Sequence, residues 1–263
     1  MPAPNALIAL EQIGKIYDGA AVLTDASLSI AKGQFVALVG GSGAGKTTLL
    51  KTINALIIPT TGRVLIDGQD VAAQPGPALR RRIGYVFQEV GLFPHMTVAQ
   101  NIGITPSLLD WPADRIAARV DTLLDLVALP RESAARLPAA LSGGQRQRVG
   151  VARALAAEPS ILLMDEPFGA LDPVTRVALA QDVRRLHETL GLTTVMVTHD
   201  VGEALLTADR IVVLAEGRII ADDTPAALLA GAHSDPRVAA LIDAPRRQAE
   251  KLARLAQKGG AHG

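Results

Sequence analysis

A glycine-rich stretch between an apolar segment and a predicted helix constrains this chain more than any other feature. Residues 40–47 read Gly-Gly-Ser-Gly-Ala-Gly-Lys-Thr and follow the apolar run of residues 35–39. The spacing GxxxxGK[ST] between a strand and a helix is typical of a phosphate-binding loop, because small residues let backbone N–H groups curl around an anion. The positive end of the helix dipole adds to that attraction. The stretch predicts a site for a nucleotide diphosphate or triphosphate, with an ordinary glycine-rich turn as the alternative.

Two side chains of this loop and an acidic pair further along the chain predict a magnesium site. Lys46 would reach the terminal phosphates, and the Thr47 hydroxyl would bind Mg²⁺. Asp165 and Glu166 directly follow the apolar run 161–164, which predicts a buried strand. Asp165 would hold the hydration shell of Mg²⁺ beside Thr47, and Glu166 could accept a proton from an attacking water. Alone, the acidic pair is weak evidence, since many strands end in a charged turn.

Composition limits the class of protein. Lysine plus arginine and aspartate plus glutamate both number 26, so the net charge is zero and a strongly basic nucleic-acid platform is not expected. The absence of cysteine excludes disulfides and thiolate metal sites. The N-terminus lacks the pattern of a signal peptide, and no apolar run approaches the ~20 residues of a membrane helix. These features predict a soluble, intracellular α/β protein that does not bind nucleic acid.

The order of apolar and turn-forming segments indicates an α/β fold with a helical insertion. Residues 15–19 are predicted to form a loop, and residues 93–158 are mostly helical, with an apolar stripe at helical spacing in residues 114–126. Asp172 and Pro173 are expected to open a helix. Strands are predicted at residues 7–10, 26–30, 35–39, 63–68, 83–87, 161–164, 193–198, 211–214 and 218–220. The layout is a parallel-sheet core interrupted by helices.

Residues 141–145, which read Leu-Ser-Gly-Gly-Gln, form the most specific motif of the chain. A helix is predicted to begin at Ser142, whose hydroxyl would cap it. Free amides and a hydroxyl at a helix start make a second anion site, remote in sequence from the first. A helix cap alone does not explain the Gly-Gly-Gln-Arg-Gln-Arg continuation. The motif therefore indicates an anion site rather than a structural cap only.

Together these motifs resemble the ATP-binding subunits of ABC transporters, in which LSGGQ is the signature sequence. The resemblance covers residues from about 7 to 230, with the motifs in the family's order. It implies an α/β, ABC-type P-loop NTPase with a RecA-like parallel-sheet core, an N-terminal antiparallel β subdomain and an inserted α-helical subdomain at about 93–158. The ATPase domain would span residues 1–243, and residues 244–263 would form a charged tail.

The resemblance also implies roles for single residues. Gln88 matches the Q-loop glutamine, Asp172 the D-loop, His199 the switch histidine that contacts the γ-phosphate, and Tyr17 the aromatic residue that stacks on adenine. A packed tyrosine or a surface histidine is the ordinary alternative for the last two. The residues implied to bind ATP are Tyr17, Gly40, Gly41, Ser42, Gly43, Ala44, Gly45, Lys46, Thr47 and Thr48. The catalytic residues would be Glu166, His199, Lys46 and Gln88, and the Mg²⁺ ligands Thr47, Gln88 and Asp165. Ser142, Gly143, Gly144 and Gln145 would contact the ATP of a partner chain.

Other stretches, less specific than the ATPase motifs, resemble the sequences of osmoprotectant importers. These importers carry glycine betaine, choline, carnitine or related quaternary amines. The matching stretches are residues 51–57, 79–88, 91–97, 109–112 and 148–151. Many members of that group continue into paired regulatory domains, whereas this chain stops, so regulation through such a domain is not expected. An ABC transporter for another substrate, such as an amino acid, or for lipid trafficking or export is the alternative. A soluble ABC ATPase without a transport role is less favoured, because long coiled-coil insertions and tandem cassettes are absent.

The resemblance implies partners as well. These are a second ATPase subunit in a head-to-tail pair, expected to be identical, membrane permease subunits contacted through residues 88–101, and a periplasmic or extracellular substrate-binding protein. The chain would then lie on the cytoplasmic side of the inner or plasma membrane, held there by the permease subunits.

Overall fold

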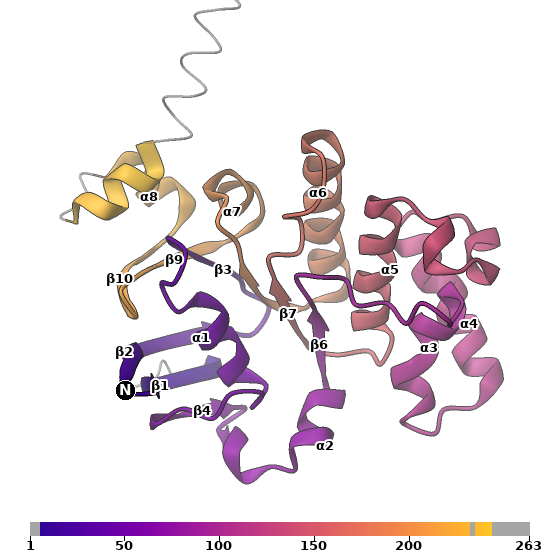
Figure 1. Cartoon of the computed structure of the whole chain (residues 1–263), viewed down its shortest axis with the longest axis horizontal. Helices are drawn as coiled ribbons and strands as arrows, with labels where there is room; N and C mark the ends of the chain where they lie inside the picture. Colours follow the sequence, from indigo (N-terminus) through magenta and orange to yellow (C-terminus); the bar gives the residue numbers. More distant parts are fainter. Residues whose placement is uncertain (1–5, 232–234, 244–263) are drawn as a thin grey trace, which may run out of the picture.

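Two β-sheets carry the fold (Figure 1). The computed structural model describes residues 6–231 and 235–243, so the predicted tail at 244–263 lies outside the described residues. The larger sheet has the order β10-β9-β3-β8-β7-β6, with β10 antiparallel to β9 and the other neighbours parallel. Its strands are β3 (Phe35–Val39), β6 (Ile83–Val86), β7 (Ile161–Asp165), β8 (Thr193–Val197), β9 (Arg210–Ala215) and β10 (Arg218–Asp223). Their ends differ from the predicted ones by at most three residues.

Three neighbouring strands of this sheet, β3, β8 and β7, have their carboxyl ends side by side, which brings distant segments of the chain together. In the register of the sheet, Leu38 on β3 pairs with Val197 on β8, which pairs with Asp165 on β7. Because these strands are parallel, the residues that follow them emerge at the same edge, where ligands bind in open α/β sheets. The glycine-rich loop from Gly40, the segment after Asp165 and the loop with His199 therefore lie next to one another.

The smaller sheet is antiparallel, with the order β2-β1-β4-β5. Its strands are β1 (Ala6–Tyr17), β2 (Ala20–Ala31), β4 (Thr61–Ile66) and β5 (Gln69–Asp70). The prediction of a loop at residues 15–19 is wrong. Strand β1 continues to Tyr17, and only a tight turn separates it from β2. The register shifts between Leu10 and Ile13, and Gln12 has a φ of 51°. Such an irregularity breaks the alternation of apolar residues, so the sequence pattern ended the strand too early.

Helices cover both faces of the larger sheet, and three of them gather beside its β6 edge. The helices are α1 (Lys46–Ile53), α2 (Gly76–Arg81), α3 (Val98–Ser107), α4 (Ala113–Leu126), α5 (Gly143–Leu155), α6 (Pro173–Leu190), α7 (Val201–Thr207) and α8 (Pro225–Ala230), with short 3₁₀ turns at Val71–Ala73, Arg131–Ala135 and Pro138–Ala140. Helix α3 contacts both α4 and α5, and these three lie on the far side of β6 from α1 (Figure 1). The mostly helical character predicted for residues 93–158 corresponds to this group.

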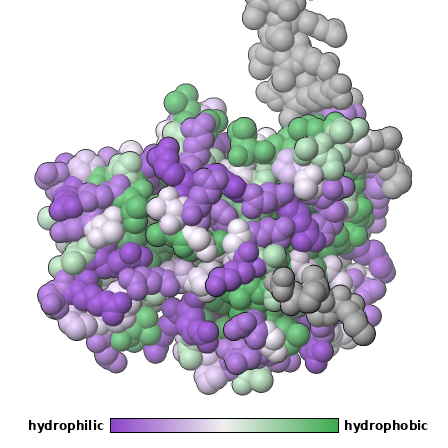
Figure 2. Space-filling model, turned by 180° about the vertical axis from the view of Figure 1, so that it is seen from behind, coloured by the Kyte–Doolittle hydropathy of each residue, from purple (hydrophilic) through white to green (hydrophobic). Residues whose placement is uncertain are grey.

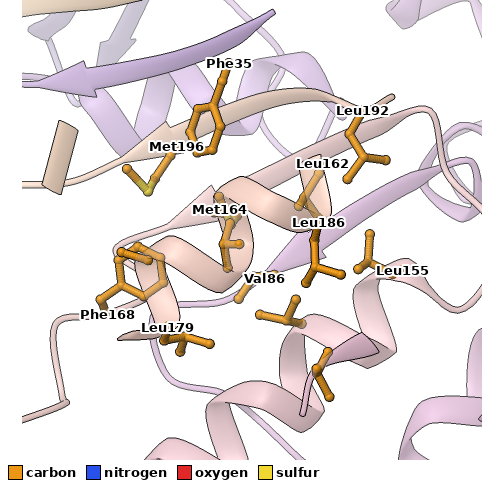
Figure 3. Packing of buried hydrophobic residues seen from close by; sticks show 14 of the residues in the cluster. Phe35, Val86, Leu155, Leu162, Met164, Phe168, Leu179, Leu186, Leu192 and Met196 are labelled. Atoms are coloured by element: carbon orange, nitrogen blue, oxygen red, sulfur yellow. The ribbon is translucent and has the colours of Figure 1, made fainter. Parts of the chain in front are cut away.

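Every residue of β3, β7 and β8 is buried, which explains why these runs are apolar without alternation. Side chains alternate between two hydrophobic clusters, one on each face: Phe35 belongs to the first and Val36 to the second. On the face that α6 covers, Met164 of β7 lies near Val86 of β6 and Leu186 of α6 (Figure 3). This two-sided packing fixes the strand ends that carry the candidate site.

None of the helices within the described ranges is long and apolar enough to cross a membrane. On the face opposite to that of Figure 1, hydrophilic and hydrophobic residues intermingle (Figure 2).

Candidate nucleotide site

The loop between β3 and α1 has the backbone that its glycines predict. Gly40 has a φ of 149°, and a Cβ atom there would lie 2.1 Å from the Leu214 carbonyl oxygen. Gly45 has a φ of 94°, and its Cβ would lie 2.8 Å from the Val22 carbonyl oxygen. Both positions therefore need glycine for conformation and for space. The loop passes directly into α1, so the helix start points its free amides at the loop.

Gly40→Ala is expected to lower the free energy of unfolding by about 3 kcal/mol or more, because backbone strain adds to the overlap with Leu214. Gly43→Ala is the matched control: its φ is 77°, but nothing lies within 4 Å of a Cβ there, so a loss of only about 1–2 kcal/mol is expected. Urea unfolding without nucleotide measures both. Equal losses would contradict the close approach at Gly40.

The Lys46 side chain lies across the loop. Its ammonium donates hydrogen bonds to the carbonyl oxygens of Gly40 and Gly41, both at 2.9 Å, and the residue is buried. Burial lowers the pKa of Lys46, while the negative charges of Glu166 and Asp165 act in the opposite direction. A buried cation beside the free amides at the start of a helix is suited to a phosphate group.

The residues beside Lys46 fit a magnesium ion. The Thr47 hydroxyl donates to Asp165 Oδ1 at 2.7 Å, so a hydroxyl oxygen and a carboxylate oxygen already lie together. Mg²⁺ prefers oxygen ligands and commonly takes one or two carboxylates together with substrate phosphates. In the part of the chain that the structure describes, no group of three or more His, Cys, Asp or Glu residues is arranged for a metal. The donor set therefore suits Mg²⁺ held with a nucleotide, rather than a metal held by protein alone.

Glu166 lies between two other predicted site residues. Its Oε2 accepts a hydrogen bond from Gln88 Nε2 at 3.2 Å and lies 3.3 Å from His199 Nδ1. The Glu166 backbone has a φ of 44°, held by a hydrogen bond from its N–H to the Val197 carbonyl oxygen. Strained backbone that its surroundings hold in place is common at functional sites. The structure gives Gln88 a contact with Glu166, so the role of Gln88 as a Mg²⁺ ligand stays a prediction.

Tyr17 lies at the end of β1, beside the glycine-rich loop. It pairs with Ala20 at the start of β2, and Val22 of β2 approaches Gly45 of the loop. Tyr17 is 41% exposed, and Lys15 Nζ lies 4.9 Å from its ring centroid. An accessible aromatic face near a phosphate site is consistent with stacking on a base.

The signature residues begin α5. The Ser142 hydroxyl accepts from the Gln145 N–H at 3.2 Å, and the Gln145 side chain accepts from the Ser142 N–H at 2.9 Å, which is a capping box. A Cβ on Gly144 would lie 2.6 Å from Thr175 Cγ2, and the Thr175 N–H donates to the Asp172 carboxylate at 3.0 Å. Hydrogen bonds from the side chain of Thr175 and from its backbone N–H lower the pKa of Asp172.

The signature and Asp172 thus lie together, whereas α5 is separated from α1 by β6 and β7 (Figure 1). Ser142 and Gly143 are exposed. Within one chain, the structure does not bring this second anion site to the glycine-rich loop.

Asp165 makes two contacts that the sequence analysis did not predict. Tyr85 donates its hydroxyl hydrogen to Asp165 Oδ2 at 3.3 Å, and Lys51 Nζ lies 3.7 Å from the same oxygen. Lys51 follows Thr47 by one helical turn, a spacing that places both on one face of α1 and could have indicated the contact. The Tyr85 contact depends on the pairing of β6 with β7, for which the sequence holds no local signal.

The parallel sheet, the glycine-rich loop and the acidic strand end define a P-loop nucleoside triphosphatase. The group of helices α3, α4 and α5, with the signature at residues 141–145, narrows this class to the ABC type. The comparison with known families agrees, since residues 23–169 match the family described as ABC transporter. The chain belongs to the ABC transporter family. The family and the fold class predicted from the motifs are confirmed.

Individual relatives are similar over most of this chain. The glycine betaine/carnitine/choline transport ATP-binding protein OpuCA of Bacillus subtilis is 51% identical over 85% of the chain and 59% of its own length. The choline transport ATP-binding protein OpuBA of the same organism is 50% identical over 83% of the chain and 58% of its own length. The sulfate/thiosulfate import ATP-binding protein CysA of Caulobacter vibrioides is 49% identical over 83% of the chain and 65% of its length. The chain therefore spans less than two thirds of these relatives.

A solved structure shares the fold. The dimeric post-hydrolysis state of the ATP-binding cassette MJ0796 bound to ADP and Pi superimposes with a TM-score of 0.75 at 33% identity, covering 83% of this chain and 98% of that one.

Proposed function

We propose that this chain is the ATP-binding and ATP-hydrolysing subunit of an ABC importer for osmoprotectants of the quaternary amine class. The observation that carries the proposal is the 51% identity to a transport protein for glycine betaine, carnitine and choline over 85% of the chain. ATP would be hydrolysed to ADP and phosphate, and the energy would drive transport through separate membrane subunits.

The loop of residues 40–47 would hold the ATP phosphates. Its backbone N–H groups and the start of α1 face the phosphate position, and the Lys46 ammonium would exchange its carbonyl contacts for phosphate oxygens. Tyr17 would stack on adenine. Mg²⁺ would be held by Thr47 and Asp165, with Gln88 as a further predicted ligand, and when bound it neutralises negative charge on the terminal phosphates.

Glu166 would act as the general base for hydrolysis. Its carboxylate is held from two sides, by the Gln88 amide and the His199 ring, in a position to accept a proton from water. His199 is more than half exposed and would contact the γ-phosphate while keeping its bond to Glu166. Lys46 would stabilise the negative charge that develops on the phosphate oxygens.

Two copies of the chain would close head to tail around ATP. The exposed start of α5 lies across β6 and β7 from the glycine-rich loop, so Ser142, Gly143, Gly144 and Gln145 would contact the ATP of the partner copy. Asp172, packed beside them, would belong to the same interface. The cassette MJ0796 has been solved as a dimer with ADP and Pi, which supports this arrangement.

A groove beside β6 is the proposed contact with permease subunits. It has a volume of about 620 Å³ and runs between the segment after β6 and the helices α3 and α5. Four exposed apolar residues line it, Leu56, Phe87, Phe93 and Leu108, together with Arg80 and Arg81. Permease subunits docked here would hold the chain at the cytoplasmic side of the membrane and connect it to an external substrate-binding protein.

The substrate class is tested on the complex purified with its native membrane subunits. ATPase activity is expected to rise when the binding protein is loaded with glycine betaine or choline, and to stay at the basal rate with an unrelated amino acid or with sulfate. Stimulation by another compound only would leave the ATPase assignment standing and overturn the osmoprotectant assignment.

An importer of sulfate or thiosulfate is the second candidate. It is supported by the relative CysA, whose identity of 49% is close to that of the osmoprotectant proteins. Stimulation by the sulfate-loaded binding protein alone would favour this candidate.

A further inference from the structure

Asp165 has two oxygens with different surroundings. Oδ1 accepts from the Thr47 hydroxyl at 2.7 Å, on the side where a magnesium ion would lie. Oδ2 faces away from this pair, toward the Tyr85 hydroxyl at 3.3 Å and Lys51 Nζ at 3.7 Å. Only 5% of the Asp165 side chain is exposed, so water contributes little to holding the carboxylate. Its orientation therefore depends on these neighbours.

Tyr85 reaches from this carboxylate to the groove beside β6. Tyr85 lines the groove, and its ring centroid lies 4.6 Å from that of Phe87, a residue that is 46% exposed. One side chain thus touches both the acidic strand end and the surface proposed to meet a permease.

We propose that Tyr85 is a positioning residue that orients Asp165 for Mg²⁺ and connects this carboxylate to the groove. The inference rests on the proposed function. Groups that hydrogen-bond a metal ligand from behind fix its direction, and their loss typically lowers metal affinity by 10- to 100-fold. A partner that moves the Phe87 ring would move Tyr85 with it, and so change how well Asp165 faces the metal.

The test measures binding of a fluorescent, non-hydrolysable ATP analogue to the full chain, in EDTA and across a range of Mg²⁺ concentrations. Tyr85→Phe keeps the ring and removes only the hydroxyl. It is expected to bind the analogue in EDTA within about twofold of the unsubstituted chain. Because Lys51 still holds Oδ2, the Mg²⁺ concentration for half-maximal tightening is expected to rise by about 3- to 10-fold, below the usual range for losing such a group.

The matched control is Thr122→Val, which removes a hydroxyl that bonds the Ala118 carbonyl oxygen within α4. No change in Mg²⁺ dependence is expected for it. Phe87→Leu leaves the Tyr85 hydroxyl in place but removes its ring contact, and should shift the Mg²⁺ dependence in the same direction by a smaller factor.

Unchanged Mg²⁺ dependence in Tyr85→Phe would overturn the proposal, and an unchanged Phe87→Leu would overturn the connection to the groove. A merely structural role would weaken binding equally in EDTA and in Mg²⁺, which would also contradict it. If the unsubstituted chain bound no analogue under either condition, the proposed function itself would fail, together with this inference.

Discussion

Glu166→Gln is expected to bind ATP with nearly unchanged affinity and to lose turnover by about 10²- to 10⁴-fold, the usual contribution of a general base. The amide keeps the shape of the carboxylate and can still meet Gln88 and His199, but it cannot accept a proton from water. Steady-state phosphate release and equilibrium ATP binding, measured on the same preparation, separate the two effects.

A second glutamate on the surface provides the control. Glu188 pairs with Arg184 on α6, outside the candidate site, so Glu188→Gln is expected to hydrolyse ATP at the unsubstituted rate. Turnover by Glu166→Gln within a few-fold of that rate would show that another group accepts the proton.

Lys46→Ala is expected to affect binding itself. Charge-assisted hydrogen bonds contribute about 1.5–3 kcal/mol, so the substitution should weaken ATP binding by about 10- to 100-fold. The loss of the ammonium also leaves the Gly40 and Gly41 carbonyl oxygens without their donor. Titration calorimetry with ATP and Mg²⁺ measures the change.

Lys32→Ala serves as the matched substitution, because this exposed lysine lies in the turn between β2 and β3. It should bind ATP as the unsubstituted chain does. Equal affinities for Lys46→Ala and Lys32→Ala would remove Lys46 from the nucleotide site.

The sequence predicts those features that local signals encode. Helix α6 begins at Pro173 behind the Asp172 cap, as expected, because a capping side chain and a first-turn proline act within a few residues. The strand that ends at Asp165 is apolar without alternation because both of its faces are covered. The phosphate loop is likewise defined by its own glycines.

Features that depend on pairing between distant segments could not be predicted in this way. The extension of β1 to Tyr17 passes an irregularity at Gln12 that interrupts the apolar pattern. The meeting of Glu166 with Gln88 and His199 requires the order of β6, β7 and β8 in the sheet. The same holds for the contact of Tyr85 with Asp165. The individual site motifs can therefore be identified from the sequence, but the arrangement of their side chains in space cannot.

The most direct test of the account is the mass of Glu166→Gln in solution, measured by light scattering with and without saturating ATP and Mg²⁺. If each ATP is completed by the signature of a second copy, the protein should be monomeric alone and have twice the chain mass with ATP. The exposed Ser142 would lie at that interface, so the double variant with Ser142→Arg should stay monomeric while still binding ATP. A protein that binds ATP at full occupancy and remains a monomer would contradict the composite site.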